Sequence, residues 1–266
     1  MIIGESGVQI SVIVPVLNNV YFLEKAITSI LHQDYQQIEL IIIDGGSTDG
    51  SLEIIKKYSS QIYYWESGKD LGISDAFNRG LRESTGDLIA ILNSDDYWKK
   101  NTVDLIISAY TQHGNYGVYY GSIEFIDSST MSKYIKNPII KNMACRMSLF
   151  HPAIFVKKEV YEKVGLYSLE YEYAMDCEWL HRSMNSGVSF YKINRVLACM
   201  SLGGKSDEFY VRSLWEYRKS SIENNITPKI KAYYCFIKYA FLKYITSYKF
   251  IRTFKQKTIN KARSFN

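Results

Sequence analysis

Short apolar runs alternate with amphipathic stretches over the first hundred residues of the chain. The apolar runs have the length of buried strands and span 9–16, 38–43, 62–65 and 88–92. The stretches between them place apolar residues on one helical stripe and span 21–32, 51–58 and 73–83. Strands that alternate with helices in this way predict an α/β fold, with a mostly parallel sheet covered by helices on both faces.

The pattern continues less regularly beyond residue 100. We predict helices over 102–111 and 174–186, and strands near 153–156 and 190–200. A further strand over 118–125 is expected to be more exposed than the others, and 127–150 shows no clear period.

Charge divides the chain into two parts. After Glu223 there are no acidic residues and ten basic ones, so residues 1–223 hold 22 basic and 27 acidic residues, a net charge of −5. We therefore expect a domain over 1–223 and a basic, aromatic-rich helical tail over 224–266.

The tail has the pattern of an amphipathic helix. Four basic residues fall within about 60° of arc at 100° per residue, and four apolar residues lie roughly opposite. The basic set is Lys231, Lys238, Lys249 and Arg252, and the apolar set is Phe236, Ala240, Ile251 and Phe254. Lysines interrupt every apolar stretch before the ~20 residues that a membrane span needs. We expect the tail to lie on an anionic membrane surface, with part of its apolar face packed on the domain. No nucleic-acid-binding motif is present, and the acidic domain would repel nucleic acid.

The four cysteines lie far apart and show no C-x-x-C spacing. They are expected to be free thiols in a reducing compartment. Residues 1–9 lack a basic region followed by an apolar core, so we expect no export and a cytoplasmic protein at the inner face of the plasma membrane.

Polar side chains follow three of the predicted strands. Asn93-Ser94-Asp95-Asp96 comes directly after the run 88–92, Asn18 follows the first strand, and Asp44 opens a glycine-rich turn after the second. Carboxyl ends of parallel strands share one crevice, where open α/β sheets bind ligands. Adjacent carboxylates there can hold a divalent cation together with phosphate oxygens. The alternative interpretation is a set of polar turns and helix caps.

Two nucleotide-binding classes are disfavoured. Gly204-Lys205-Ser206 would need a glycine at position 199 to form a P-loop, and Cys199 stands there. No G-x-G-x-x-G follows the first strand, which argues against a nicotinamide dehydrogenase.

Three fragments occur in a distinctive order, SVIVPVLNN, IIIDGGSTDGS and DLGISDAFNRGLRESTGDLIAILNSDD. Over residues 9–206 the chain resembles the inverting family 2 glycosyltransferases of the GT-A fold, which have a Rossmann-like nucleotide-binding half. The resemblance implies transfer of a hexose or N-acetylhexosamine from a nucleotide diphosphate sugar, a UDP-sugar, to a saccharide hydroxyl.

The resemblance also implies roles for residues on the donor side. Pro15 and Asn18 would lie beside the nucleoside, and Asp44 would read the uracil. The pyrophosphate and ribose side would be lined by Gly72, Asp75 and Arg79, although a solvated helix face is the alternative for Arg79. Lys205, in a loop like the one that closes over the donor, would meet the pyrophosphate.

The metal motif of the family reads Asp-x-Asp, whereas Asn93 takes the first position here. By resemblance, Asp95 binds Mg²⁺ or Mn²⁺ directly. Asn93 would hydrogen-bond the ribose or a metal-bound water, Ser94 would belong to the donor-binding residues, and Asp96 would lie near the transferred sugar or the acceptor.

The segment 173–180 resembles the acidic motif that opens a helix near the acceptor, which makes Asp176 the expected catalytic base. Glu178 should point elsewhere, because two residues turn a helical side chain by about 200°. His151 would touch the acceptor or the diphosphate, with a structural role as the alternative.

Many bacterial relatives extend a sugar chain on a polyprenyl diphosphate lipid, as in O-antigen and other surface polysaccharides. The resemblance therefore implies a lipid-linked saccharide acceptor. Two alternatives stay open. One is a sugar-phosphate nucleotidyltransferase, whose glycine-rich, lysine-containing loop is absent here. The other is an inactive membrane-associated scaffold, suggested by Asn93.

Overall fold

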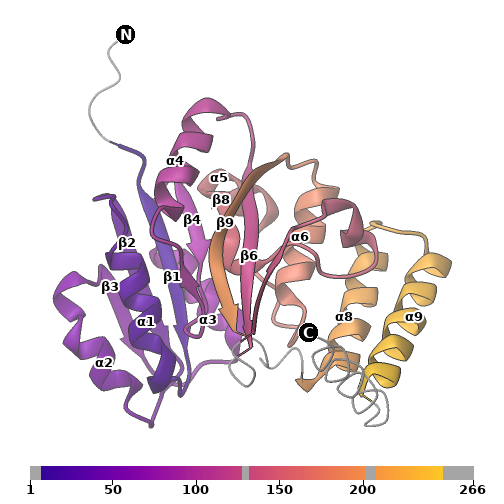
Figure 1. Cartoon of the computed structure of the whole chain (residues 1–266), viewed down its shortest axis with the longest axis horizontal. Coiled ribbons are helices and arrows are strands. Elements are labelled where there is room, and N and C mark those ends of the chain that lie inside the picture. The colour runs from indigo at the N-terminus through magenta and orange to yellow at the C-terminus, as the bar shows by residue number, and fades with distance from the viewer. Residues whose placement is uncertain (1–6, 128–131, 202–207, 248–266) are drawn as a thin grey trace, which may run out of the picture.

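The computed structural model describes residues 7–127, 132–201 and 208–247 (Figure 1). Its centre is a nine-stranded sheet in the order β3-β2-β1-β4-β8-β6-β9-β5, with β7 paired to β6. Strands β1 (Ile10–Val16), β2 (Ile38–Asp44), β3 (Tyr64–Ser67) and β4 (Leu88–Ile91) run parallel to one another. The predicted α/β fold with a mostly parallel nucleotide-binding half is confirmed.

The second half of the sheet is mixed. Strand β8 (Ile154–Lys157) is antiparallel to β4 and to β6 (Val118–Asp127), and β9 (Phe190–Ser201) runs parallel to β6. The short strands β5 (Tyr97–Trp98) and β7 (Ser132–Lys136) pair antiparallel with β9 and β6. After the Asp95-Asp96 turn the chain enters β5, which pairs with β9 at the end of the sheet opposite β3.

Helices cover both faces of the sheet, as the alternating pattern predicted. Val12 and Val14 pack with α1 (Val20–Leu31), whereas Ile13 points to the other face and packs with Phe77 of α3 (Ile73–Glu83). The remaining helices are α2 (Ser51–Lys57), α4 (Thr102–Gln112), α5 (Lys158–Val164), α6 (Met175–Asn185), α8 (Tyr210–Glu223) and α9 (Lys229–Ser247). Three short 3-10 turns are η1 (Ser59–Gln61), η2 (Ile140–Ala144) and η3 (His151–Ala153).

Two expectations are corrected, and two helices were missed. The strand expected to be exposed, β6, is buried along its first six residues, because β8 and β9 flank it and helices cover both faces. Helices α5 and α8 were not predicted. Cys145 and Cys235 form a disulfide across 90 residues, so these two are not free thiols, while Cys177 and Cys199 are free and buried.

The expected tail helix exists as α9, and it packs on α8 (Figure 1). The guanidinium carbon of Arg218 on α8 lies 3.5 Å from the Trp215 ring centroid and 4.4 Å from that of Tyr233 on α9. Phe236, expected on the apolar face, packs against Trp215 with the ring centroids 5.8 Å apart, which confirms that the domain takes part of that face. Residues Lys249, Ile251, Arg252 and Phe254 lie outside the described part of the chain.

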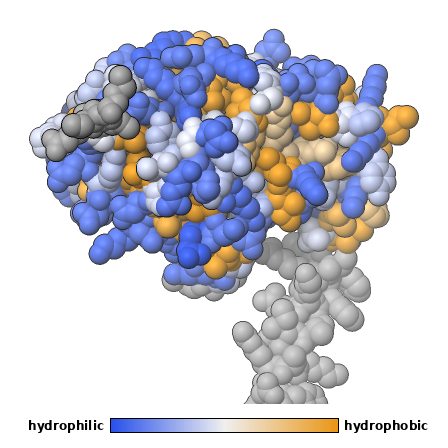
Figure 2. All heavy atoms as spheres, turned by 90° about the horizontal axis from the view of Figure 1, so that it is seen from above, coloured by the Kyte–Doolittle hydropathy of each residue, from blue (hydrophilic) through white to orange (hydrophobic). Residues whose placement is uncertain are grey.

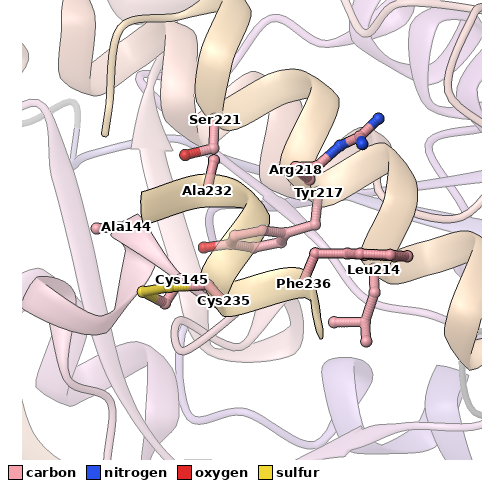
Figure 3. A pocket seen from close by; sticks show the side chains of 9 residues that line it. All are labelled: Ala144, Cys145, Leu214, Tyr217, Arg218, Ser221, Ala232, Cys235 and Phe236. Atoms are coloured by element: carbon pink, nitrogen blue, oxygen red, sulfur yellow. A yellow bond between two sulfur atoms is a disulfide. The ribbon is translucent and has the colours of Figure 1, made fainter. Parts of the chain in front are cut away.

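A small cavity lies between η2, α8 and α9, beside the disulfide (Figure 3). Its volume is about 10 Å³, room for about one water molecule. Arg218 Nε and Ser221 Oγ line it and have no hydrogen-bond partner. None of the predicted site residues lines this cavity, which is too small for a nucleotide.

Candidate active site

The carboxyl ends of β1, β2 and β4 are joined by hydrogen bonds between their following loops. Asn18, in the left-handed region with φ 49°, accepts a hydrogen bond from Thr48 N–H through Oδ1 at 2.8 Å. Asn19 donates through Nδ2 to Ser94 Oγ at 2.8 Å. The three strand ends that the sequence singled out therefore form one continuous edge.

Asp44 shapes the loop after β2. Its carboxylate is fully buried and accepts hydrogen bonds from the hydroxyls of Ser47 and Ser67, both at 2.5 Å. It also accepts the Ser47 backbone N–H at 3.1 Å. The predicted contact between Asp44 and a nucleobase stays a prediction, and the structure gives this carboxylate a loop-holding role.

The turn after β4 presents Asn93, Asp95 and Asp96 at the same edge. Desolvation raises the pKa of the Asp95 carboxyl, and desolvation plus the neighbouring Asp95 charge raise the pKa of Asp96 well above its usual value. Asp96 Oδ1 accepts the Ser201 N–H at 3.3 Å, which ties the turn to the end of β9. A buried acid beside a partly buried one is costly unless it is protonated or paired with a cation.

A divalent cation fits this turn. Asn93 Oδ1 and Asp96 Oδ2 are buried oxygens with no hydrogen-bond partner, which is unusual unless a ligand or water satisfies them. No cluster of three or more histidine, cysteine or acidic side chains that could hold a metal occurs in the described ranges. The turn instead offers the one or two carboxylates with which Mg²⁺ is usually held beside phosphate oxygens.

The turn after β4 is connected through Trp98 to the segment that holds His151. Trp98 Nε1, two residues after Asp96, donates to the Pro152 carbonyl at 2.9 Å. His151 stacks on Phe77 with ring centroids 5.3 Å apart, and its Nε2 lies 3.1 Å from Tyr167 Oη. Burial lowers the pKa of His151 to about 4, so its ring is neutral at pH 7. Its Nδ1 is buried without a hydrogen-bond partner.

Asp176 stands in the first turn of α6, at a helix start held by α8. Glu216 accepts the backbone N–H groups of Tyr173 and Ala174, both at 2.8 Å. Asp176 Oδ1 accepts the Cys177 N–H at 2.7 Å. Burial raises the pKa of Asp176 to about 6, which the Glu216 charge reinforces. The carboxylate is therefore more basic than an exposed one and still ionised at neutral pH.

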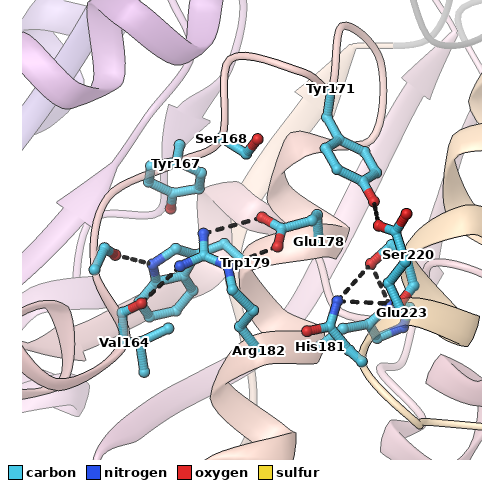
Figure 4. A network of polar contacts seen from close by, with 12 residues as sticks. Val164, Tyr167, Ser168, Tyr171, Glu178, Trp179, His181, Arg182, Ser220 and Glu223 are labelled. Carbon is cyan, nitrogen blue, oxygen red and sulfur yellow. Dashed lines mark hydrogen bonds and ion pairs between the residues drawn. The ribbon is translucent and has the colours of Figure 1, made fainter.

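A polar network fixes the rest of α6 (Figure 4). Arg182 donates to both carboxylate oxygens of Glu178, at 2.6 and 2.9 Å, and to the Val164 carbonyl at 2.6 Å. His181 Nδ1 lies 2.8 Å from Ser220 Oγ on α8. The expectation that Glu178 points away from Asp176 and pairs elsewhere is confirmed.

Two of the residues expected to line the pyrophosphate side, Arg79 and Asp75, already have partners within the protein. Arg79 Nε forms an ion pair with Glu66 of β3 at 2.7 Å. Asp75 accepts the Leu71 N–H at 3.3 Å, and Gly72, at φ 110°, is the residue before α3. Pro15 is buried within β1. Lys205 lies outside the described residues.

Three contributors to the site were not predicted. Asn19 holds Ser94, Tyr167 lies between His151 and α6, and Glu216 caps the helix that carries Asp176. Burial raises the pKa of Tyr167 well above its usual value, and Tyr161 and the Asp176 charge add to this effect. Contacts thus lead from His151 through Tyr167 to Trp179 of α6, the helix that carries Asp176, while Trp98 links the turn after β4 to Pro152, next to His151.

Comparison with known proteins agrees with the family resemblance seen in the sequence. Residues 11–160 match the family described as Glycosyl transferase family 2. The chain is 27% identical to a PGL/p-HBAD biosynthesis glycosyltransferase of Mycobacterium bovis, over 64% of this chain and 67% of that protein.

Two solved structures share the fold. The first is S. aureus TarS 1-349 in complex with UDP-GlcNAc, with a TM-score of 0.65 and 15% identity, covering 87% of this chain and 71% of that one. The second is the mannosyltransferase PcManGT from Pyrobaculum calidifontis in complex with GDP-Man and Mn²⁺. It has a TM-score of 0.65 and 17% identity, covering 85% of this chain and 66% of that one.

Proposed function

Because the chain belongs to glycosyl transferase family 2, we propose that it moves a hexose or N-acetylhexosamine from a UDP-sugar to a saccharide hydroxyl with inversion. The observation that carries the proposal is the turn after β4, where Asn93 Oδ1 and Asp96 Oδ2 are buried without partners beside Asp95. Such oxygens suit a cation and the diphosphate of a nucleotide sugar. Two structures with this fold hold nucleotide sugars, one of them with Mn²⁺.

Each residue then has a defined task. Asp95 would hold Mg²⁺ or Mn²⁺, with Asp96 and Asn93 completing the polar wall of the turn. The bound ion supplies Lewis-acid stabilisation of the charge that develops on the departing diphosphate. Asn18 and Ser94 lie where the strand ends meet and would contact the nucleoside.

Asp176 would act as the general base. It accepts the proton of the acceptor hydroxyl while that oxygen bonds to the anomeric carbon, and the bond to the diphosphate breaks on the opposite face. Its pKa of about 6 suits this task at neutral pH, because the carboxylate is ionised and its conjugate acid is weaker than that of an exposed aspartate. His151 Nδ1 would contact the acceptor or the diphosphate.

The donor half of the proposal can be tested by calorimetry. UDP is titrated into the wild type with Mn²⁺ and with EDTA, and the same is done for Asp95→Ala and for the exposed control Asp104→Asn. We expect Mn²⁺ to strengthen UDP binding at least 10-fold in the wild type and the control, and to have no effect in Asp95→Ala. Equal affinities with Mn²⁺ and EDTA in the wild type would contradict metal assistance. Absence of UDP binding under both conditions would favour an inactive scaffold.

Transfer is measured with a panel of radiolabelled nucleotide sugars and lipid-diphosphate monosaccharides. Product formation from a UDP-sugar is the expected result. Release of labelled sugar 1-phosphate and UTP on addition of pyrophosphate, without transfer to the lipid acceptor, would instead indicate a nucleotidyltransferase.

We also propose that α9 docks on an anionic membrane surface, where a polyprenyl-diphosphate-linked acceptor for bacterial surface polysaccharide would lie. Four apolar residues spaced along one helical face are 60–86% exposed, namely Ile230, Tyr234, Ile237 and Phe241. At 100° per residue they fall within about 60° of arc. Exposed lysines flank them, namely Lys229, Lys231 and Lys238. Apolar side chains are visible at this end of the molecule, on the right of Figure 2.

This arrangement suits attachment in the plane of the bilayer interface. No helix in the part of the chain that the structure describes has both the length and the apolar character to cross a bilayer. Because Cys145 and Cys235 form a disulfide, the cysteines no longer support a cytoplasmic location. The proposal of that location therefore depends on the proposed acceptor alone.

Vesicle co-sedimentation tests the membrane contact. We expect binding to vesicles that contain phosphatidylglycerol, little binding to pure phosphatidylcholine, and release at high salt, since each lysine near an anionic surface adds about 1 kcal/mol. A Lys231→Glu, Lys238→Glu double variant should bind more weakly, whereas Lys56→Glu on α2 should not. Equal binding to both vesicle types would refute the charge-dependent contact.

A further inference from the structure

The loop after β2 leaves its own aspartate out of reach of a ligand. Asp44 has no exposed surface, and its oxygens are held by the Ser47 and Ser67 hydroxyls. A nucleobase at the sheet edge could reach it only if this loop were rebuilt. If the base is recognised by a carboxylate, another residue must provide it.

Asp70, in the loop between β3 and α3, occupies the place where a side chain of residue 45 would stand. A Cβ atom built on Gly45 would lie 2.7 Å from Asp70 Oδ2 and 3.3 Å from Asp70 Cγ. Glycine at position 45 is therefore what allows this carboxylate to lie over the end of β2. Any larger residue there would push Asp70 away.

The orientation of Asp70 leaves one oxygen toward this edge. Its Oδ1 accepts the Gly72 N–H at 2.9 Å, which fixes the carboxylate in the loop. Its Oδ2 is the atom directed at Gly45. The Asp70 residue is partly exposed, whereas Asp44 is buried.

Apolar surface for a flat ring adjoins this carboxylate. Leu17, half exposed at the end of β1, brings Cδ1 to 3.4 Å from the same Cβ position over Gly45. The adjoining Gly46 is exposed and has no side chain to block the approach of a ring. An apolar face beside a hydrogen-bond acceptor is the combination that a pyrimidine edge requires.

We propose that Asp70, and not Asp44, accepts the N3–H of the uracil ring and so selects the nucleobase of the donor. The inference rests on the proposed use of a UDP-sugar. Uracil presents an N–H donor at N3, and a carboxylate oxygen is the strongest acceptor available to it. Gly45 and Asp70 act together, because the one provides the space that the other fills.

Methylation of uracil N3 isolates this hydrogen bond. UDP and N3-methyl-UDP are titrated, with Mn²⁺ present, into the wild type and into variants of the full chain. We expect the wild type to bind UDP about 10- to 100-fold more tightly than the methylated analogue, as for a lost hydrogen bond to a charged group. In Asp70→Ala the two affinities should agree within about threefold. Asp70→Asn should keep part of the preference, because its amide oxygen still accepts.

Two controls separate this role from general damage. Asp44→Asn should weaken both ligands by the same factor, since it acts through the loop, and the exposed Asp34→Asn should change neither. A preference that survives in Asp70→Ala, or one that disappears in Asp44→Asn, would overturn the assignment while leaving the sugar-transfer proposal intact. Failure of the wild type to bind UDP at all would overturn both. Circular dichroism confirms that each variant is folded before its affinities are compared.

Discussion

Replacement of Asp176 by asparagine should stabilise the protein and strongly reduce transfer. Burial raises the pKa of this carboxyl from 3.8 to about 6. The charged form is thus disfavoured in the folded state relative to the unfolded state. At 1.36 kcal/mol for each tenfold change in acidity, the cost of the charge is about 3 kcal/mol.

The sign of the pH dependence follows from linkage. Below pH 3.8 the carboxyl is protonated in both states and costs nothing. As pH rises from 3.8 to about 6 the unfolded chain loses its proton first, so the free energy of unfolding falls, and above about pH 6 the full penalty is present. Asparagine has nearly the same shape, keeps an Oδ1 to accept the Cys177 N–H, and carries no charge.

Urea unfolding of the wild type and Asp176→Asn, followed by fluorescence at pH 4, 6 and 8, measures this difference. We expect Asp176→Asn to be more stable by up to about 3 kcal/mol at pH 8, with the gain shrinking towards zero at pH 4. The exposed control Asp104→Asn should show no such trend. A gain independent of pH, or a loss of stability at pH 8, would refute the claim that this carboxylate is held ionised at a cost.

Activity gives the second half of the same prediction. Asp176→Asn should lose about 10²–10⁴-fold in turnover while its calorimetric affinity for UDP is unchanged. Wild-type turnover should fall about tenfold for each pH step of one below about 6, as the base becomes protonated. Unchanged turnover in the variant would remove Asp176 from the mechanism.

Two predictions concern stability away from the chemistry. Gly80→Ala on α3 should lower the free energy of unfolding by about 1–3 kcal/mol, because the new methyl group would lie 2.4 Å from Ile13 Cγ2. Gly68→Ala serves as the control in the same urea titration, because its methyl group would meet nothing within 4 Å. Equal stability of the two variants would show that α3 can move away from β1. Cys235→Ser should lower the free energy of unfolding by about 2–4 kcal/mol, because it removes a cross-link that spans 90 residues. Dithiothreitol should lower the melting temperature of the wild type and leave that of the variant unchanged. A wild-type melting temperature that reductant does not affect would argue that this cross-link contributes nothing to stability.

Local pattern was enough to predict the parallel half of the sheet and its helices. The apolar run 88–92 and the stripe 73–83 became β4 and α3 within a residue, because strands buried on both faces and amphipathic helices leave unmistakable periods. The pattern was not enough for β6, which was expected to be exposed although long-range pairing buries its first six residues. Burial there depends on strands that are distant in sequence.

The amino-acid sequence by itself determined which residue types stand at the strand ends, since Asn18, Asp44 and Asp95-Asp96 each follow an apolar run whose direction fixes where they emerge. Only the tertiary structure decided what each can do. It enclosed Asp44 within its own loop, placed Asp70 over Gly45, and set Asp176 on a helix capped by Glu216. The physical reason is that burial, hydrogen-bond partners and pKa depend on neighbours up to a hundred residues away, which no local pattern contains.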